Sequence, residues 1–353
     1  SQTITSTGAD GTLRHWKIPP APEVAASPGG ETTAFAVNRA GKIAAVAGVH
    51  QTRPAVFLLE VGSGKTLQTL LGHEGANNNI ASSNDGKQLT TGGADNTARL
   101  GNLAGPKFPQ LQKAQHAAPV TAVAISPDGT QFYSAATDNV IRCWSAADGS
   151  LVREIKGHTG AVAGMTARGE TLFSASADGT VRLWKTADGA AIRSINHGAA
   201  ISCLSVDDAG ALVASGGADS NVKLWNAADG AAIAALAGHS SALIDLQLSK
   251  DATRLVSLSA AELFHWDVAG ERRLESFVLG EGEKRGAGFW GERFATVAAD
   301  GSLTFIEPNL LQLIDAHAGG TLSLALLPDG KRAITSGADK TVKLWNLEDG
   351  QPL

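Results

Sequence analysis

The sequence has little of several residue types, and each scarcity excludes a class of protein. It contains two cysteines, Cys143 and Cys203, in 353 residues, so neither a disulfide framework nor a cysteine-based zinc site is expected. No apolar run approaches the roughly 18 residues that a transmembrane helix needs, and we predict no membrane partner. The formal net charge is only −5, with both signs interspersed, which argues against nucleic acid as a partner.

What the chain does have is internal repetition. SASADGTVRLWKTADG (174–189) and SGGADSNVKLWNAADG (215–230) have the same layout. Each predicts a short strand, a tight turn with Asp, a second strand that ends in Trp, and an Asp-Gly turn. Stretches such as VTAVAIS (120–126), which precede these pairs, are nearly continuous in small apolar residues. Such runs are typical of strands buried on both faces.

Nine copies of this unit follow one another along the chain. The strand-ending residue recurs every 39 to 43 residues, as Trp16, Leu59, Gly101, Trp144, Trp184, Trp225, Trp266, Ile306 and Trp345. In seven copies an aspartate lies six residues before this mark, and a Ser or Thr lies four residues earlier again. A histidine recurs ahead of these positions in six places. The repeat therefore combines four residue types at fixed spacing.

This pattern resembles the WD40-repeat family, whose signature pairs a Gly-His with a Trp-Asp in units of about 40–45 residues. The similarity covers essentially the whole chain, although Trp-Asp is literal only at Trp266-Asp267. The resemblance implies an all-β fold, a single β-propeller of four-stranded antiparallel blades. We expect residues 1–353 to form one such domain of nine blades, with eight as the alternative. The N- and C-terminal strands would close the ring.

Serine, histidine and aspartate in a fixed order also invite a catalytic interpretation. An active site is needed once, whereas complete sets occur in four copies: His116/Ser134/Asp138/Trp144, His158/Ser174/Asp178/Trp184, His197/Ser215/Asp219/Trp225 and His317/Thr335/Asp339/Trp345. The resemblance implies that each set forms a structural hydrogen-bonded chain from Trp N–H through hydroxyl and imidazole to carboxylate. Such a chain pairs polar groups that would cost about 1–3 kcal/mol each if buried unpaired. We therefore predict no catalytic residues and no metal ligands.

The stretch EVGSGKT (60–66) ends like a phosphate-binding loop. The pattern G-x-x-x-x-G-K-[ST] needs a further glycine five residues before Gly64, and that position holds Leu59. Aligned on the repeat, Gly64 falls where Gly149 falls, between the third and fourth strands of a copy. We predict a hairpin turn here, and no nucleotide or other cofactor.

The innermost strand of each copy should line a central channel, where propeller enzymes gather ionisable side chains. Among the expected inner strands only Asp245 carries charge. A hydrolase, lyase or metal centre would need more such groups. We predict that the protein is not an enzyme, and a cluster of ionisable residues around Asp245 would favour the opposite.

Side chains that depart from the repeat indicate where a partner could bind. The intact copies mostly place alanine beside their turns, whereas the degenerate copies carry charged and aromatic residues. The candidate partner-binding residues are His50, Arg53, Glu283, Lys284, Arg285 and Trp290. The alternative is that the charges are ordinary solvated positions of decayed repeats and that Trp290 folds onto its blade.

Together these observations predict a monomeric, non-catalytic scaffold that binds a protein or peptide through its loop faces. A rigid ring would hold scattered side chains in one pattern, so that binding loses little entropy. Two alternatives stay open. One is a propeller module of a larger multidomain protein whose activity lies in other segments, and the other is an enzyme that uses the central channel.

Overall fold

The computed structural model describes residues 3–18, 23–26, 31–37, 43–61, 63–83, 85–103, 110–291 and 293–353. These residues form strands and turns, and none of them lies in a helix long and apolar enough to cross a membrane. The described strands make nine antiparallel sheets, which confirms the all-β fold and matches the nine repeat units. By their contacts the sheets divide into unit 1 (residues 1–22 and 307–353) and unit 2 (residues 23–306).

Unit 2 contains seven four-stranded sheets, the blades. The first three are β4 (Ala34–Val37), β5 (Ile43–His50), β6 (Arg53–Glu60), β7 (Thr66–Leu71); β8 (Asn77–Ser82), β9 (Gln88–Gly93), β10 (Thr97–Asn102), β11 (Gln110–Gln115); and β12 (Val120–Ile125), β13 (Gln131–Ala136), β14 (Ile141–Ser145), β15 (Leu151–Ile155). The next two are β16 (Val162–Arg168), β17 (Thr171–Ser176), β18 (Thr180–Lys185), β19 (Ala191–Asn196); and β20 (Ile201–Val206), β21 (Leu212–Gly217), β22 (Val222–Asn226), β23 (Ala232–Leu236). The last two are β24 (Leu243–Leu248), β25 (Arg254–Ser259), β26 (Glu262–Asp267), β27 (Arg272–Val278); and β28 (Lys284–Trp290), β29 (Arg293–Ala298), β30 (Ser302–Ile306), with β3 (Glu23–Ala26) as the fourth strand.

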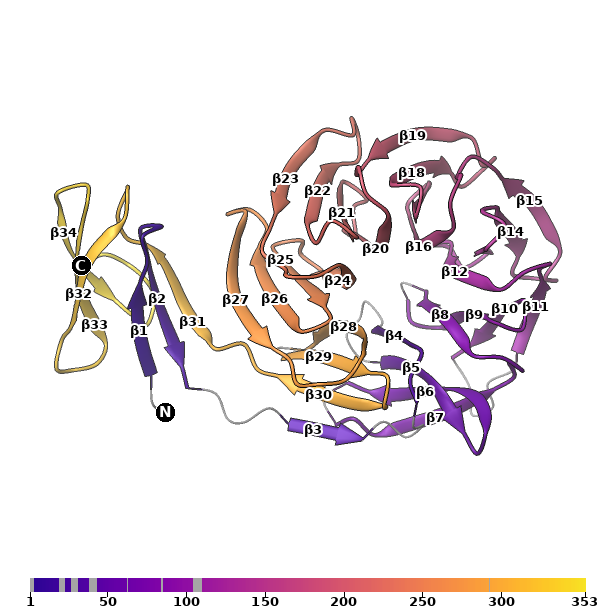
Figure 1. Cartoon of the computed structure of the whole chain (residues 1–353), viewed down its shortest axis with the longest axis horizontal. Coiled ribbons are helices and arrows are strands. Elements are labelled where there is room, and N and C mark those ends of the chain that lie inside the picture. The colour runs from indigo at the N-terminus through magenta and orange to yellow at the C-terminus, as the bar shows by residue number, and fades with distance from the viewer. Residues whose placement is uncertain are drawn as a thin grey trace. The chain divides into compact units, whose positions relative to one another are not determined.

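The seven blades of unit 2 close into a ring (Figure 1). Each innermost strand contacts that of the next blade, and β28 contacts β4 to complete the circle. Strand β3 closes the last blade by pairing antiparallel with β30, Val24 opposite Thr304. This differs from the expected single ring of nine closed through both chain ends. The reason is that β3 covers the edge of β30 and β28 packs against β4, so unit 2 has no place for another blade.

Unit 1 contains the other two sheets, each of three described strands. They are β1 (Thr3–Thr7), β2 (Thr12–Lys17) and β31 (Leu310–Asp315), and β32 (Thr321–Leu326), β33 (Arg332–Gly337) and β34 (Val342–Asn346). Leu13, Ile314 and Trp345 belong to their shared core. Leu326 of β32 is 50% exposed, whereas Ile125, at the corresponding position of β12, is 6% exposed.

The strand-ending tryptophans hold neighbouring blades of unit 2 together. Trp184 packs with Ile141 and Ile155 of the preceding blade, and Trp144 packs with Ala98 of the blade before its own. Trp225 and Trp266 likewise pack against residues of the preceding blade. Burying so large an aromatic side chain at each junction contributes strongly to the core.

The phosphate-loop look-alike is a turn between β6 and β7. Gly64 has φ 67°, and its N–H donates to the Glu60 carbonyl over 2.9 Å. Gly149 has φ 73°, and its N–H donates to Ser145 in the same way. The positive φ explains the glycine, and the predicted hairpin turn is confirmed.

Candidate functional site

The blade β16–β19 contains a continuous chain of buried hydrogen bonds. The Trp184 indole N–H donates to Ser174 Oγ over 2.9 Å, and Ser174 Oγ lies 2.8 Å from His158 Nε2. His158 Nδ1 lies 2.8 Å from a carboxylate oxygen of Asp178. Because the carboxylate accepts, Nδ1 carries the proton and the serine hydroxyl donates to Nε2. Each polar group of the set therefore has a partner.

Two further sets have the same connections. His197 lies 2.8 Å from Ser215 and 3.1 Å from Asp219, and Trp225 donates to Ser215 over 2.8 Å. In unit 1, His317 lies 2.8 Å from Thr335 and 2.9 Å from Asp339. Trp345 donates to Thr335 over 2.8 Å. These residues come together as the sequence spacing suggested.

The set in blade β12–β15 departs from this arrangement at its carboxylate. His116 lies 2.7 Å from Ser134, which also accepts the Trp144 N–H over 2.7 Å. Asp138 instead pairs with the Arg142 guanidinium at 2.7 Å, and Arg142 Nη1 lies 3.2 Å from His116 Nδ1. The arginine thus stands between the imidazole and the carboxylate.

Sequence reasoning missed one related set in blade β24–β27. His239 lies 2.7 Å from Ser257, which accepts the Trp266 N–H over 2.8 Å. The carboxylate comes from Glu262, which accepts the Ser240 N–H over 2.9 Å and lies 3.6 Å from His239. The missed signal is a glutamate two residues beyond the usual aspartate position, whose longer side chain reaches back to the histidine.

Burial and hydrogen bonding shift the pKa values in these sets. Desolvation lowers the pKa of His116 and of His239 to about 4. For Asp219, desolvation opposes ionisation, but hydrogen bonds from Lys223, His197 and the Asn221 N–H prevail and lower its pKa to about 2. At neutral pH the histidines are therefore neutral and the aspartate is ionised, as the hydrogen-bond directions require.

Two candidate partner-binding residues, His50 and Arg53, flank the two-residue turn between β5 and β6. They oppose each other in the strand register, and Arg53 is exposed. Gln51 and Thr52 both have positive φ, 47° and 75°, the geometry of a tight hairpin that suits strand twist. The turn therefore presents its side chains in a fixed direction.

Glu283 and Arg285 lie on the adjacent blade and on the same face. Arg285 pairs with Glu283 at 2.9 Å, and the two side chains are 36% and 65% exposed. Backbone hydrogen bonds join the two blades here: the Ala299 N–H donates to Glu283, and the Thr32 N–H donates to Ala299. His50, Arg53, Glu283 and Arg285 thus form one sector, called the polar sector below.

The other two candidates lie inside the protein, and these expectations are corrected. Lys284 is 7% exposed, and its ammonium group points to the Glu281 carbonyl at 3.4 Å. Trp290 is 3% exposed, and its ring centroid lies 5.1 Å from that of Phe305, in a cluster with Leu59. The large apolar ring gains more from this junction between blades than from solvent. Neither side chain is displayed to a partner.

Residues of the inner strands of unit 2 line a cavity that is open to solvent. Asp245 lies in its wall and accepts the N–H groups of Ala287 and Leu246 over 3.0 and 2.8 Å. Desolvation nevertheless raises its pKa to about 7. Arg168 and Lys250 also line the cavity. Within the described ranges no three His, Cys, Asp or Glu side chains are grouped to hold a metal ion.

The two cysteines of the chain are buried free thiols in different blades. Burial raises the pKa of Cys143 to about 11 and that of Cys203 further. Both therefore stay protonated and are poor nucleophiles at neutral pH.

Comparison with known proteins places this architecture in a family. A family model described as "WD domain, G-beta repeat" matches residues 64–100, 109–145, 149–185, 189–226 and 308–346, more than half of the chain. WD repeat-containing protein 3 of Homo sapiens is 30% identical over 119 residues, 32% of this chain and 12% of that protein. The U5 small nuclear ribonucleoprotein 40 kDa protein of Dictyostelium discoideum is 28% identical over 96 residues, 27% of each chain. A p21-activated protein kinase-interacting protein 1-like protein of Xenopus laevis is 48% identical over 40 residues, 11% of each chain.

These matches span only 11% to 27% of the relatives' own lengths, so they compare repeats and not whole proteins. The matched repeats contain all four complete sets of histidine, hydroxyl, aspartate and tryptophan predicted from the sequence. Repeat length, four-stranded blades and family matches agree, and the chain belongs to the WD40-repeat family.

Proposed function

We propose that this chain is a non-catalytic scaffold that binds a protein or peptide partner through the polar sector. The observation that carries the proposal is the contact between β28 and β4. It makes blade β4–β7, with His50 and Arg53, a direct neighbour of blade β28–β30, with Glu283 and Arg285. The side chains that depart from the repeat therefore share one face of the ring. The neighbouring intact blades mostly place alanine at the same turns.

The local geometry supports a binding surface that is rigid before the partner arrives. The β5–β6 turn is a two-residue hairpin, and an ion pair joins Glu283 to Arg285. A surface that is already ordered loses less conformational entropy when it binds. Arginine side chains are also frequent energetic centres of protein interfaces.

Relatives named for their assemblies support a protein as the partner. One is named as a p21-activated protein kinase-interacting protein and another as a small nuclear ribonucleoprotein component. The family resemblance favours binding without catalysis. With a net charge of −5, the proposed partner is not nucleic acid, and the proposed state of the chain is a monomer.

The test compares the chain with the double variant Arg53→Ala/Arg285→Ala in affinity capture from extract of the source cells. The matched control is Lys156→Ala/Lys185→Ala, which removes the same charge from exposed positions on other blades. We expect a protein that the parent and the control retain and the double variant loses, with unchanged thermal unfolding. Equal capture by all three would show that the polar sector is not the binding face.

A further inference from the structure

The blade β8–β11 has the histidine, hydroxyl and aspartate of a complete set but lacks the tryptophan. His73 lies 2.8 Å from Thr91 and 2.9 Å from Asp95. Gly101 occupies the tryptophan position, because it pairs with Leu89 as Trp144 pairs with Phe132. The same register shift occurs immediately before Gly101 in the pairing of β10 with β11 and before Trp144 in the pairing of β14 with β15. This blade therefore lacks the indole but has the other three side chains of the network.

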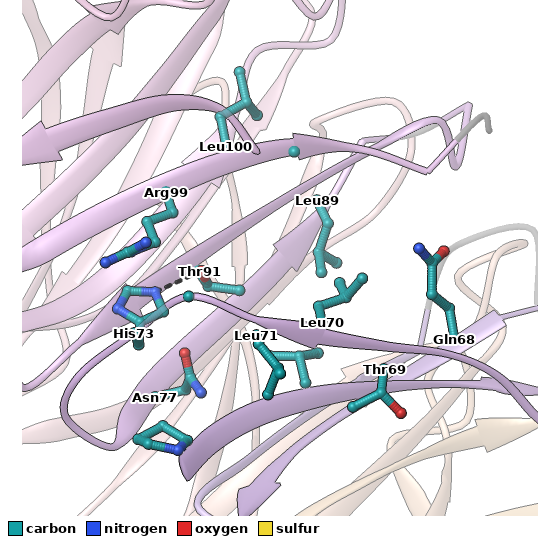
Figure 2. A pocket seen from close by; sticks show the side chains of 14 residues that line it. Gln68, Thr69, Leu70, Leu71, His73, Asn77, Leu89, Thr91, Arg99 and Leu100 are labelled. Atoms are coloured by element: carbon teal, nitrogen blue, oxygen red, sulfur yellow. Dashed lines mark hydrogen bonds between the residues drawn. The ribbon is translucent and has the colours of Figure 1, made fainter. Parts of the chain in front are cut away.

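A pocket lined in part by Gly101 lies at this position, and Figure 2 shows side chains that line it. It measures about 650 Å³, including the part open to solvent, and Val56, Leu71, Leu89, Thr91 and Gly101 are in its wall. In blade β12–β15, Trp144 packs on Ala98 of blade β8–β11. The repeat equivalent of Ala98 in blade β4–β7 is Val56, which is in the wall of the pocket. Leu71 is 52% exposed, which places it at the rim.

The other two departures from tryptophan in unit 2 place a buried side chain at the tryptophan position. Leu59 is fully buried and Ile306 is 5% exposed, so aliphatic side chains fill those positions. Glycine offers no side chain to do this at position 101. Leu89, smaller than its equivalent Phe132, widens the site further.

The pocket keeps the hydrogen-bond acceptor that the missing indole would use. In six described sets a tryptophan N–H donates to the Ser or Thr oxygen over 2.7 to 2.9 Å. At Thr91 the hydroxyl proton is directed to His73 Nε2, because His73 Nδ1 donates to Asp95. The Thr91 oxygen therefore retains lone pairs for an N–H donor from outside.

A second acceptor in the pocket wall has no hydrogen-bond partner at all. Asn77 is 2% exposed, and its side-chain oxygen has no hydrogen-bond partner in the structure. Its amide nitrogen is 3.5 Å from the Ala55 carbonyl. A buried acceptor without a donor is costly, and a ligand with a second N–H would remove that cost.

We propose that this pocket binds the indole of a tryptophan side chain carried by a partner peptide. The indole would take the position of the missing residue and donate its N–H to Thr91 Oγ1. An adjacent peptide N–H would reach Asn77. This inference names one side chain of the partner in the proposed function, and its test uses a small probe, so that it can fail without the polar sector failing.

The probe is N-acetyl-tryptophanamide, titrated into the whole chain by calorimetry. We expect saturable binding, at least tenfold weaker or lost in Gly101→Trp, whose own side chain fills the pocket. That variant should also unfold at a higher temperature. Gly101 lies in strand β10 without a positive φ, and Trp144 occupies the equivalent position with the same register shift, so the variant is expected to fold.

Two comparisons test the hydrogen bond. The probe methylated on the indole nitrogen should bind the parent at least fivefold more weakly than the unmethylated probe. Thr91→Ser, which keeps the hydroxyl, should preserve this preference, and Thr91→Val should abolish it. Absence of binding, equal binding of both probes to the parent, or binding unchanged in a folded Gly101→Trp variant would each overturn the proposal.

Discussion

Ser174 is the residue at which the structural role of a blade network can be measured most directly. Its hydroxyl is fully buried and joins two side chains, accepting from Trp184 and bonding His158. In Ser174→Ala the Trp184 N–H and His158 Nε2 lose their common partner. Both side chains are less than 10% exposed, at 3% and 7%, so water cannot readily replace it.

The expected loss follows from the two orphaned groups. Each buried polar atom left unpaired costs about 1–3 kcal/mol, which gives about 2–6 kcal/mol for the substitution. Ser150→Ala is the matched control, because Ser150 is exposed and its hydroxyl donates to the exposed Asp148. A surface change of this kind should stay within about 0.5 kcal/mol.

The assay is urea unfolding followed by circular dichroism, with free energies extrapolated to water. Trp184→Phe and the double variant complete a thermodynamic cycle, in which we expect a coupling of at least about 1 kcal/mol between the two positions. A loss below about 0.5 kcal/mol in Ser174→Ala, or strictly additive effects, would refute the claim that the network stabilises the blade.

Three further predictions concern pH and backbone geometry. His116 and His239 have pKa values of about 4 in the folded state and 6.5 in the unfolded state. As pH is lowered the unfolded chain takes up these protons first. The free energy of unfolding should therefore fall as pH is lowered from 6.5 to 4, by on the order of 2–3 kcal/mol for each histidine. Asp245 has a raised pKa of about 7, so its contribution to the free energy of unfolding should weaken as pH rises from 4 to 7. Asp245→Asn should remove this change, which is on the order of 2–4 kcal/mol over that interval. Gly64→Ala, at φ 67°, should cost about 1–2 kcal/mol in urea unfolding, while Mg-ATP should leave the unfolding midpoint of the parent unchanged.

Sequence patterns predicted those parts of the fold that repeat locally. The period of about 40 residues placed the blade strands and turns, since each unit is built from contacts near in sequence. Ring closure was not predictable in this way. Strand β3 is only four residues long, Glu23–Ala26, and its partner β30 lies at the far end of unit 2. No local period marks a pairing of that kind.

The candidate site was predicted in residue type but not in exposure. Departures from the repeat are visible in the sequence, and they identified four residues that lie on neighbouring blades: His50, Arg53, Glu283 and Arg285. Burial of Trp290 depends on Phe305 and Leu59 from other strands, which a one-dimensional pattern does not place. The pocket at Gly101 was likewise hidden, since a missing side chain becomes a cavity only when its neighbours do not fill it.

The pairing of β2 with β31 has a consequence for the order of synthesis. Leu13 lies opposite Ile314, and the whole of unit 2 is translated between them. At about 5–20 residues per second, the interval lasts from roughly 15 to 60 seconds. During that time β2 carries an unpaired edge of the kind that recruits other strands, so the nascent chain is exposed to mispairing and to chaperone binding until β31 has been made.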